Sequence, residues 1–315
     1  MNTAQIQALR TQIRRCVVGQ ETAIDQVLAC LLAGGHALLE GVPGLGKTLL
    51  VKALARAIRG DYSRIQFTPD LMPADVCGHA VFDLRDHSFH LKKGPVFAHL
   101  LLADEINRAP AKTQAALLEA MQEQQVTIEG ESHALPLPFL VLATQNPLEQ
   151  EGTYPLPEAQ LDRFLVKIRM DFPSAEEELA LLIQTTTGRV GDQLDTDAVE
   201  PVLDPAAILE LQKDVASLQI DAAVSEYAVR LVRATRQWPG LSQGAGPRGT
   251  IALVRLARAL AALEERDFVI PDDIKAAAPA VLRHRVRMSP EAELEGLEVD
   301  RLLDGLLEQI PAPRA

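Results

Sequence analysis

Residues 41–48 read GVPGLGKT, and this stretch decides the fold. It matches the pattern G-x-x-x-x-G-K-[ST], in which glycines let the backbone curl so that successive N–H groups point at a bound phosphate. The apolar segment HALLE precedes it, and the segment LLVKALARAI, which favours a helix, follows it. A helix that starts here directs its positive N-terminal end at the same anion. The spacing therefore predicts a phosphate-binding loop between a buried strand and a helix.

The last residues of the loop carry the chemistry of a nucleotide site. Lys47 supplies a compact positive charge for the β- and γ-phosphates, and Thr48 offers a hydroxyl group to Mg²⁺. We expect a nucleotide to contact the whole loop and the first residues of the helix, namely Gly41, Val42, Pro43, Gly44, Leu45, Gly46, Lys47, Thr48 and Leu49.

Two acids end the apolar segment HLLLADE at residues 99–105. In an open parallel sheet, ligands bind outside the carboxyl ends of the strands, so Asp104 and Glu105 are expected beside the loop. We predict that Asp104 holds Mg²⁺ together with Thr48, and that Glu105 is the base that orients an attacking water. Two solvated acids at a strand end are the structural alternative.

The segment FLVLATQNP at residues 139–147 supplies an amide at another strand end. Asn146 could reach a water between the γ-phosphate and Glu105. A simple Asn-Pro turn is the alternative interpretation of the same residues.

Five short apolar segments alternate with helical ones, which predicts a parallel, doubly wound α/β sheet. We expect strands near 37–40, 62–67, 99–104, 139–144 and 165–170, and β-hairpins at 78–94 and 126–137. After residue 173 the pattern favours helices only, at about 206–217, 223–237, 248–264 and 271–283. The expected division is a P-loop core at 1–188, a linker at 189–204 and an all-helical lid domain at 205–315.

Composition narrows the classes of partner. The chain has 315 residues, 47% of them hydrophobic and 23% charged, as in ordinary soluble globular proteins. A formal net charge of −12 argues against sequence-independent binding of nucleic acid or anionic lipid. The basic run RHRVR at residues 283–287 is interpreted as a solvated helix end. Cys16 and Cys30 fall on apolar helix faces and are expected in the core.

The N-terminal residues and the hydropathy indicate a location. The first residues are amphipathic and polar, which is unlike a signal peptide, and no apolar run approaches the roughly 20 residues of a membrane span. We therefore expect a cytoplasmic protein without membrane insertion.

Taken together, the segments GVPGLGKT, LLLADEINRAP, LVLATQNP, LPEAQLDRF and GAGPRG resemble the MoxR-type AAA+ ATPases, in order and over nearly the whole chain. The resemblance implies hydrolysis of ATP with Mg²⁺. It also implies a homo-oligomeric ring, usually a hexamer, and a role in maturing or assembling client proteins, including cofactor or metal insertion. Several members of the family act with a partner that carries a von Willebrand factor A domain.

The resemblance also assigns roles to individual residues. It implies that Asn146 is the sensor-one residue, Arg163 the arginine finger and Arg248 the sensor-two residue, which reaches from the lid onto nucleotide. The segment VVGQ looks like the one that packs against adenine, which concerns Val18, Gly19 and Gln20. The two hairpins correspond to the family's insertions in the second core helix and before sensor one. Lys47, Glu105, Asn146 and Arg163 are thus the expected catalytic residues.

Arg163 suits an anion that belongs to a neighbouring protomer's ATP, because its charge is permanent and its planar fork matches phosphate oxygens. The alternative is that Arg163 pairs with Asp162 or Glu158 and stabilises its own turn. Arg108 is a second interface candidate, with a structural salt bridge as its alternative. Arg248 stands between two glycines of GAGPRG, a departure that loosens the start of its helix.

Other functions stay open at this point. A metal-chelatase-type ATPase subunit shares the hairpin insertions, and a small-molecule P-loop kinase would also fit an arginine-bearing lid. A nucleotide-gated binding module would not need Glu105, and the acidic charge opposes a nucleic-acid motor. His79, His87 and His90 could bind a metal if they shared one face of their hairpin, although surface positions are the simpler interpretation.

Overall fold

The computed structural model describes residues 2–85, 87–146, 153–186 and 196–313. Its centre is a sheet of five parallel strands in the order β2-β5-β8-β1-β9. The strands are β1 (Ala37–Glu40), β2 (Tyr62–Gln66), β5 (Leu100–Asp104), β8 (Leu140–Gln145) and β9 (Val166–Arg169). All five lie within a residue or two of the predicted ranges, and the parallel α/β class is confirmed.

Both faces of the sheet are covered, which explains why the central strands β5 and β8 are almost entirely buried. Because side chains alternate along a strand, Leu100 and Leu102 of β5 face one side while Leu101 and Ala103 face the other. The first side packs against α1 (Thr3–Arg14), α2 (Glu21–Leu32) and α3 (Lys47–Ala57), and the second against α5 (Ala111–Glu123). All five residues of β5 are buried.

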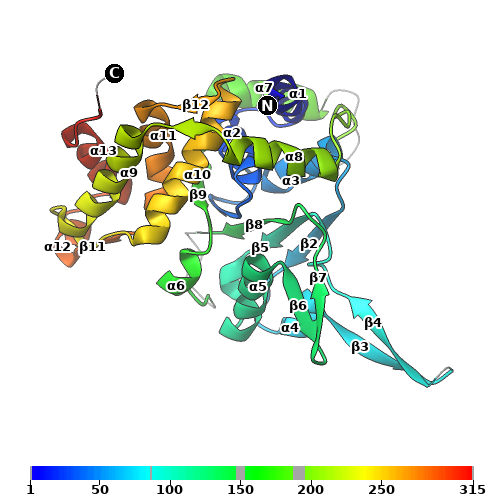
Figure 1. Ribbon diagram of the computed structural model, residues 1–315. Coiled ribbons are helices and arrows are strands. Elements are labelled where there is room, and N and C mark those ends of the chain that lie inside the picture. The colour runs from blue at the N-terminus through cyan, green and yellow to red at the C-terminus, as the bar shows by residue number, and fades with distance from the viewer. Residues whose placement is uncertain (1, 86, 147–152, 187–195, 314–315) are drawn as a thin grey trace.

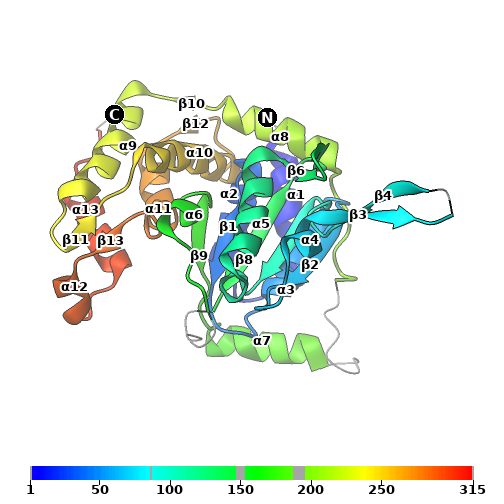
Figure 2. The same ribbon diagram turned by 90° about the horizontal axis from the view of Figure 1, so that it is seen from below.

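Two antiparallel hairpins interrupt the core, as the alternation predicted. The first follows the short helix α4 (Pro73–Cys77) and pairs β3 (Gly78–Asp83) with β4 (Ser88–Lys93). It projects away from the body, and Figures 1 and 2 show its tip far from the C-terminal helices. Asp86, which belongs to the predicted turn, lies outside the described residues. The second hairpin pairs β6 (Gln125–Ile128) with β7 (Glu131–Ala134).

The C-terminal region is helical, as predicted. Its helices are α8 (Pro205–Ala216), α9 (Ala222–Ala234), α10 (Pro247–Leu263), α11 (Pro271–Leu282), α12 (Pro290–Leu294) and α13 (Val299–Gln309). Helices α9 to α13 lie at one side of the sheet, whereas α8 packs on α2 (Figures 1 and 2). The expectation of helices alone was too simple. Strand pairs β10 (Gln219–Ile220) with β12 (Phe268–Val269), and β11 (Leu241–Gln243) with β13 (Arg287–Met288), join the loops. Strands of two or three residues are too short to show an alternating pattern.

Short helices connect these parts: α6 (Glu158–Leu161), α7 (Ala175–Thr186), and the single 3₁₀ turns η1 (Ile106–Arg108) and η2 (Thr235–Gln237). Residues 189–195 of the predicted linker lie outside the described residues, so the division at 188 and 205 stays a prediction. The rest of the linker packs on α3, where Arg56 Nη1 lies 2.6 Å from Asp197 Oδ1. Val202 N donates to Ala57 O at 2.8 Å in the same contact.

The interpretation of the basic run 283–287 as a solvated helix end was wrong for its first three residues. His284 is buried near the end of α11 beside β9, and the side chains of Arg283 and Arg285 are only 9% and 4% exposed. Carboxylates and backbone carbonyls supplied by distant segments make this burial tolerable. Cys16 and Cys30 are buried as expected.

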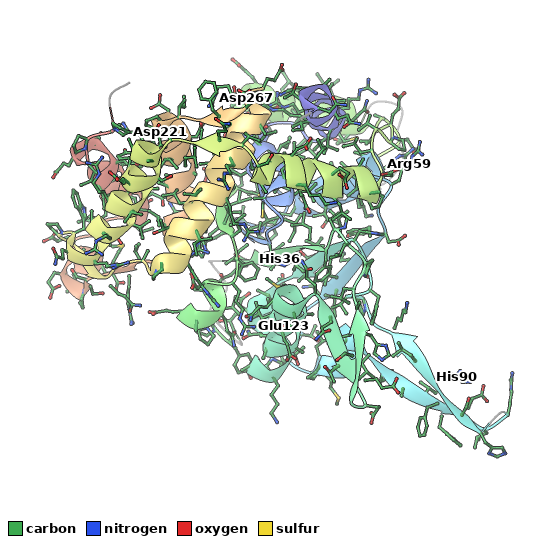
Figure 3. All side chains as sticks on the ribbon, viewed as in Figure 1. His36, Arg59, His90, Glu123, Asp221 and Asp267 are labelled. Atoms are coloured by element: carbon green, nitrogen blue, oxygen red, sulfur yellow. The ribbon has the colours of Figure 1, made fainter. Side chains whose placement is uncertain are left out.

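His36 ties three elements together just before β1, and Figure 3 labels it in the interior of the molecule. Its Nδ1 accepts a hydrogen bond from Val141 N at 3.0 Å, and its Nε2 lies 3.0 Å from Met121 O. A neutral imidazole with the proton on Nε2 satisfies both contacts. Burial lowers the pKa of His36 to about 4, and the charge of Arg255 acts in the same direction.

The pKa of His36 predicts a pH-dependent stability. An unfolded histidine takes up its proton near pH 6.5, whereas the folded one resists until about pH 4. The unfolded state therefore binds more protons between these values, and the free energy of unfolding should fall on acidification, by about 2 kcal/mol at pH 5 from this group. Urea unfolding at pH 7 and pH 5 measures it. His36→Gln should show a smaller loss on acidification, and an equal loss in both proteins would contradict the prediction.

Candidate functional site

The loop at residues 41–46 connects β1 to α3 and has the backbone shape that an anion requires. Gly44 and Gly46 adopt left-handed φ values of +91° and +80°, which side-chain-bearing residues rarely adopt. Gly46 is the N-cap of α3 and provides no side-chain cap, so the first N–H groups of the helix have no side-chain acceptor there. Gly41 lies against β9, since a Cβ atom at this position would come within 2.7 Å of Met170 O. This backbone shape is the one that a phosphate-binding loop requires.

Lys47 is half-buried at the start of α3. Its Nζ donates to Gly41 O at 2.5 Å, so the amine folds back over the loop. Burial lowers the pKa of Lys47, while the negative charges of Asp104, Glu105 and Glu40 oppose that shift. The ammonium group is placed where an incoming phosphate would replace a backbone carbonyl as its partner.

A cavity of about 290 Å³ opens over the loop and the carboxyl ends of β2, β5 and β8. Its lining contains most of the polar residues that the sequence selected, together with three that it missed, Arg64, Gln66 and Thr144. The residues are Pro43, Gly44, Gly46, Lys47, Thr48, Leu49, Arg64, Gln66, Asp104, Glu105, Thr144 and Asn146. Val42 and Leu45 of the loop pack toward the core instead.

The three missed residues could have been found from the register of the sheet. Gln66 is the parallel partner of Asp104, so β2 delivers polar side chains to the same edge as the acids. Thr144 lies two residues before Asn146, on the neighbouring strand β8.

Asp104 is buried and both of its oxygens have donors. Arg64 Nε lies 2.7 Å from Oδ2, and Thr144 Oγ1 donates to Oδ1 at 3.1 Å. Asp104 and Thr48 line the same cavity and offer the hard oxygen ligands that Mg²⁺ takes from proteins, in the small number that it needs beside phosphate oxygens. The donor set therefore fits a magnesium ion held by Thr48 and Asp104.

Glu105 is held in a strained backbone conformation, with φ of +55°. Gln66 Nε2 donates to its Oε2 at 2.7 Å, and Arg108 Nε lies 3.0 Å from the same oxygen. Its own N–H donates to Thr144 Oγ1 at 2.9 Å. Arg108 thus forms the salt bridge that was the alternative to an interface role. Asn146 is buried in the wall of the same cavity.

Arg163 lies at the opposite end of the sheet. It precedes β9, and the N–H of Leu165 donates to His36 O at 2.8 Å, directly before the start of β1. The length of β1, about 13 Å, separates that end from the phosphate-binding loop. Arg163 forms no ion pair in the part of the chain that the structure describes, because Asp162 pairs with Arg285 and Arg248, and Glu158 pairs with Arg287.

A second cavity, of about 360 Å³, surrounds Arg163. Arg248, Arg255 and Arg285 line it too, so its wall is strongly basic. Arg248 is 61% exposed and lies 3.8 Å from Asp162 Oδ2. The structure therefore brings Arg248 together with Arg163 and does not bring it into the cavity over the loop.

The segment VVGQ lies near the base of the loop but does not line its cavity. Gln20 Nε2 donates to Asp171 O at 2.9 Å, next to the Met170 carbonyl that contacts Gly41. Gly19 packs against Pro173 and the start of α7. Val18, Gly19 and Gln20 are thus linked to the loop through the chain that leaves β9.

The hairpin histidines form no cluster. Figure 3 labels His90 on the projecting hairpin. Among residues 2–85, 87–146, 153–186 and 196–313, no group of three or more His, Cys, Asp or Glu side chains could hold a metal ion. Within the same residues, no helix has the length and apolar character needed to cross a membrane.

Comparisons with known proteins agree with this geometry. Residues 36–166 match the model of the ATPase family associated with various cellular activities (AAA), and residues 233–304 match that of the AAA lid domain. The chain is 47% identical to the uncharacterised protein YeaC of Bacillus subtilis, over 96% of this chain and 92% of that protein. It is 43% identical to the chaperone MoxR1 of Mycobacterium tuberculosis, over 96% and 81%.

A solved structure is equally similar. The crystal structure of a candidate ATPase from Cytophaga hutchinsonii superposes with a TM-score of 0.90 at 41% identity and covers 99% of this chain and 96% of that one. The sequence, the fold and the loop at residues 41–48 thus indicate the same family. The chain belongs to the MoxR family of AAA+ ATPases.

Proposed function

We propose that this ATPase works as a ring in which each ATP, bound with Mg²⁺ in the cavity over residues 41–48, is hydrolysed with the help of Arg163 from a neighbouring protomer. The observation that carries the proposal is the separation of the two groups. The loop lies at the carboxyl ends of the strands, while Arg163 lies at the amino ends and lacks an ion-pair partner among the described residues. Because Arg163 is too far from the ATP site of its own protomer, it is suited to contact the ATP of a neighbouring protomer.

Within one protomer, the loop amides and Lys47 would bind the β- and γ-phosphates, and Thr48 and Asp104 would hold the metal ion. When bound, Mg²⁺ supplies positive charge that neutralises the phosphate oxygens. Glu105 orients the attacking water and takes its proton, and Asn146 hydrogen-bonds the same water. Both side chains line the cavity that also contains Lys47, which supports these roles.

Across the interface, Arg163 provides a guanidinium group for the charge that develops on the γ-phosphate. Arg248 shares its cavity, so a nucleotide contact of Arg248 would also be made with the neighbour's ATP. Head-to-tail interfaces of this kind close into rings, and we propose a hexamer. The lid contributes to the interface and could convert loss of phosphate into rotation.

The work done by the ring is remodelling of client proteins, in maturation, assembly or the insertion of a cofactor or metal. Its similarity to a protein named a chaperone supports this class of activity. A partner with a von Willebrand factor A domain would deliver the client. Phosphate found in an acceptor molecule, instead of free in solution, would favour a kinase and overturn the proposal.

Glu105→Gln should lower kcat by about 10²–10⁴-fold, because the amide cannot take a proton from water. Binding of ATP should be retained, since the loop and Lys47 are untouched. Phosphate release and equilibrium binding of a fluorescent ATP analogue measure the two effects. Glu226→Gln, at an exposed position on α9, is the matched control and should leave kcat unchanged. A Glu105→Gln protein that hydrolyses ATP at the wild-type rate would exclude Glu105 as the base.

Removal of divalent metal with EDTA should abolish hydrolysis, and added Mg²⁺ should restore it. Asp104→Asn should raise the half-saturating Mg²⁺ concentration by about tenfold or more, since second-sphere and direct carboxylate ligands contribute on that scale. Titration of ATPase activity with Mg²⁺ gives both values. Hydrolysis that continues in EDTA would contradict the metal requirement.

Mixing two inactive variants tests the shared site. Arg163→Ala protomers keep a complete loop and Glu105 but lack the finger, and alone they should be slower by about 10³–10⁵-fold. Glu105→Gln protomers keep the finger. In a 1:1 mixed ring, about one quarter of the sites combine an intact Glu105 with a neighbour's Arg163, so turnover should recover to about one quarter of wild type. A mixture that stays as inactive as its components would contradict action between protomers.

A further inference from the structure

The basic run at 283–285 forms the joint between the lid and the turn that carries Arg163. All three side chains extend from the end of α11 toward the segment around β9. Arg283 Nη1 donates to Lys167 O at 3.0 Å, and His284 Nε2 lies 3.1 Å from Phe164 O. Three consecutive lid residues thus contact the core over a stretch of six residues, 162–167.

Arg285 makes the densest of these contacts. Its Nε donates to Asp162 Oδ1 at 2.8 Å, and its Nη2 donates to Asp162 O at 3.2 Å and to Phe164 O at 2.6 Å. Its Nη1 donates to Leu165 O at 3.1 Å and to Val281 O of its own helix at 2.5 Å. The guanidinium group therefore binds the chain immediately before Arg163 and immediately after it.

The backbone of the turn is also attached to α6. The N–H groups of Asp162, Arg163 and Phe164 donate to Glu158 O, Gln160 O and Leu161 O at 3.0, 3.2 and 3.1 Å. Phe164 and Leu165 are buried, and Leu165 N bonds to His36 O, so the sheet fixes the turn on its C-terminal side. On the N-terminal side the Asp162 carboxylate is held by Arg285, with Arg248 at a longer distance of 3.8 Å. The side chain of Arg163 is left to face the basic cavity.

We propose that Arg285 is a positioning residue for ATP hydrolysis: by binding residues 162, 164 and 165 from the lid, it sets the direction in which Arg163 is presented to the neighbouring protomer. This inference rests on the proposed function, in which Arg163 acts on the neighbour's ATP.

The energetics favour positioning over simple stabilisation. Burying a guanidinium group carries a desolvation cost, and an apolar side chain of similar volume often stabilises a protein as well or better. An arginine is needed where a planar fork must fix several acceptors in one geometry. An error of about 1 Å in the position of a group in the transition state can lower the rate by about 100-fold. Hydrogen bonds that hold the turn in one position can therefore affect the rate strongly.

The contacts of Arg285 also couple the lid to the turn that carries Arg163. Arg248, on α10 of the lid, shares the Asp162 carboxylate with Arg285. A rotation of the lid would therefore shift the Asp162 carboxylate, while Leu165 stays bonded to the sheet, and so change how Arg163 meets the neighbour's phosphate.

Mixed rings test this with Arg285→Met placed in one type of protomer at a time. When Arg285→Met is added to the finger donor, Glu105→Gln, the recovered turnover should fall by about 100-fold with little change in KM for ATP. When it is added to the acceptor, Arg163→Ala, the recovered turnover should stay within about twofold, because that protomer's finger is not used. This asymmetry is not expected of a residue that only stabilises the fold.

The controls distinguish the positioning role of Arg285 from the shared ATP site on which it depends. Arg266→Met in the donor removes another lid ion pair, with Asp273, far from residues 162–165, and should leave the recovered turnover unchanged. If Arg285→Met does not fold, Asp162→Asn in the donor decides, and it should also lower turnover. If the Arg285→Met or Asp162→Asn donors gave the same recovered turnover as the donor with Glu105→Gln only, the positioning role of Arg285 would be overturned, but the shared site would stand. Failure of the unmodified pair to recover any activity would instead overturn the shared site.

Discussion

The parallel direction of the five strands is the constraint on which the rest of the molecule depends. Because all strands run the same way, their carboxyl ends meet at one edge and bring the phosphate-binding loop, Asp104, Glu105 and Asn146 around a single cavity. The same rule assigns the amino ends to the opposite edge, where the turn with Arg163 is held against the start of β1. The sheet thus separates Arg163 from the cavity over residues 41–48, and this separation is the reason for proposing that assembly completes the site.

The charged groups that line the cavity are paired with neighbouring protein groups. Lys47 bonds a loop carbonyl, Asp104 is paired with Arg64, and Glu105 is held by Gln66 and Arg108. These pairings keep the charges of a buried site balanced, as burial requires. In the proposed function, phosphate would replace the carbonyl as the partner of Lys47, and Asp104 would hold the metal ion. The strained backbone of Glu105 is part of the same arrangement.

Much of the fold and of the candidate site was predictable from the sequence, because the patterns that indicate them are local. The loop motif, the buried strands and the hairpins each occupy a continuous stretch with its own periodicity, and their positions agree with the structure. The failures involve partners that are distant along the chain. Arg285 reads as a solvated charge because its acceptors lie at residues 162–165, more than one hundred residues earlier. Gln66 could be assigned to the cavity only once the register with Asp104 was known. The nucleotide contact of Arg248 stays a prediction, and the packing of the lid adds that Arg248 shares a cavity with Arg163.

The central claim, that each ATP site is completed by a neighbour, is tested most directly by ATP turnover per protomer measured over a wide range of protein concentration. We predict that turnover per protomer rises with concentration as rings form and then reaches a plateau, whereas Arg163→Ala remains at its low value throughout. A turnover per protomer that is constant down to concentrations at which the protein is monomeric, and that is the same for Arg163→Ala, would contradict the claim and return the site to a single chain.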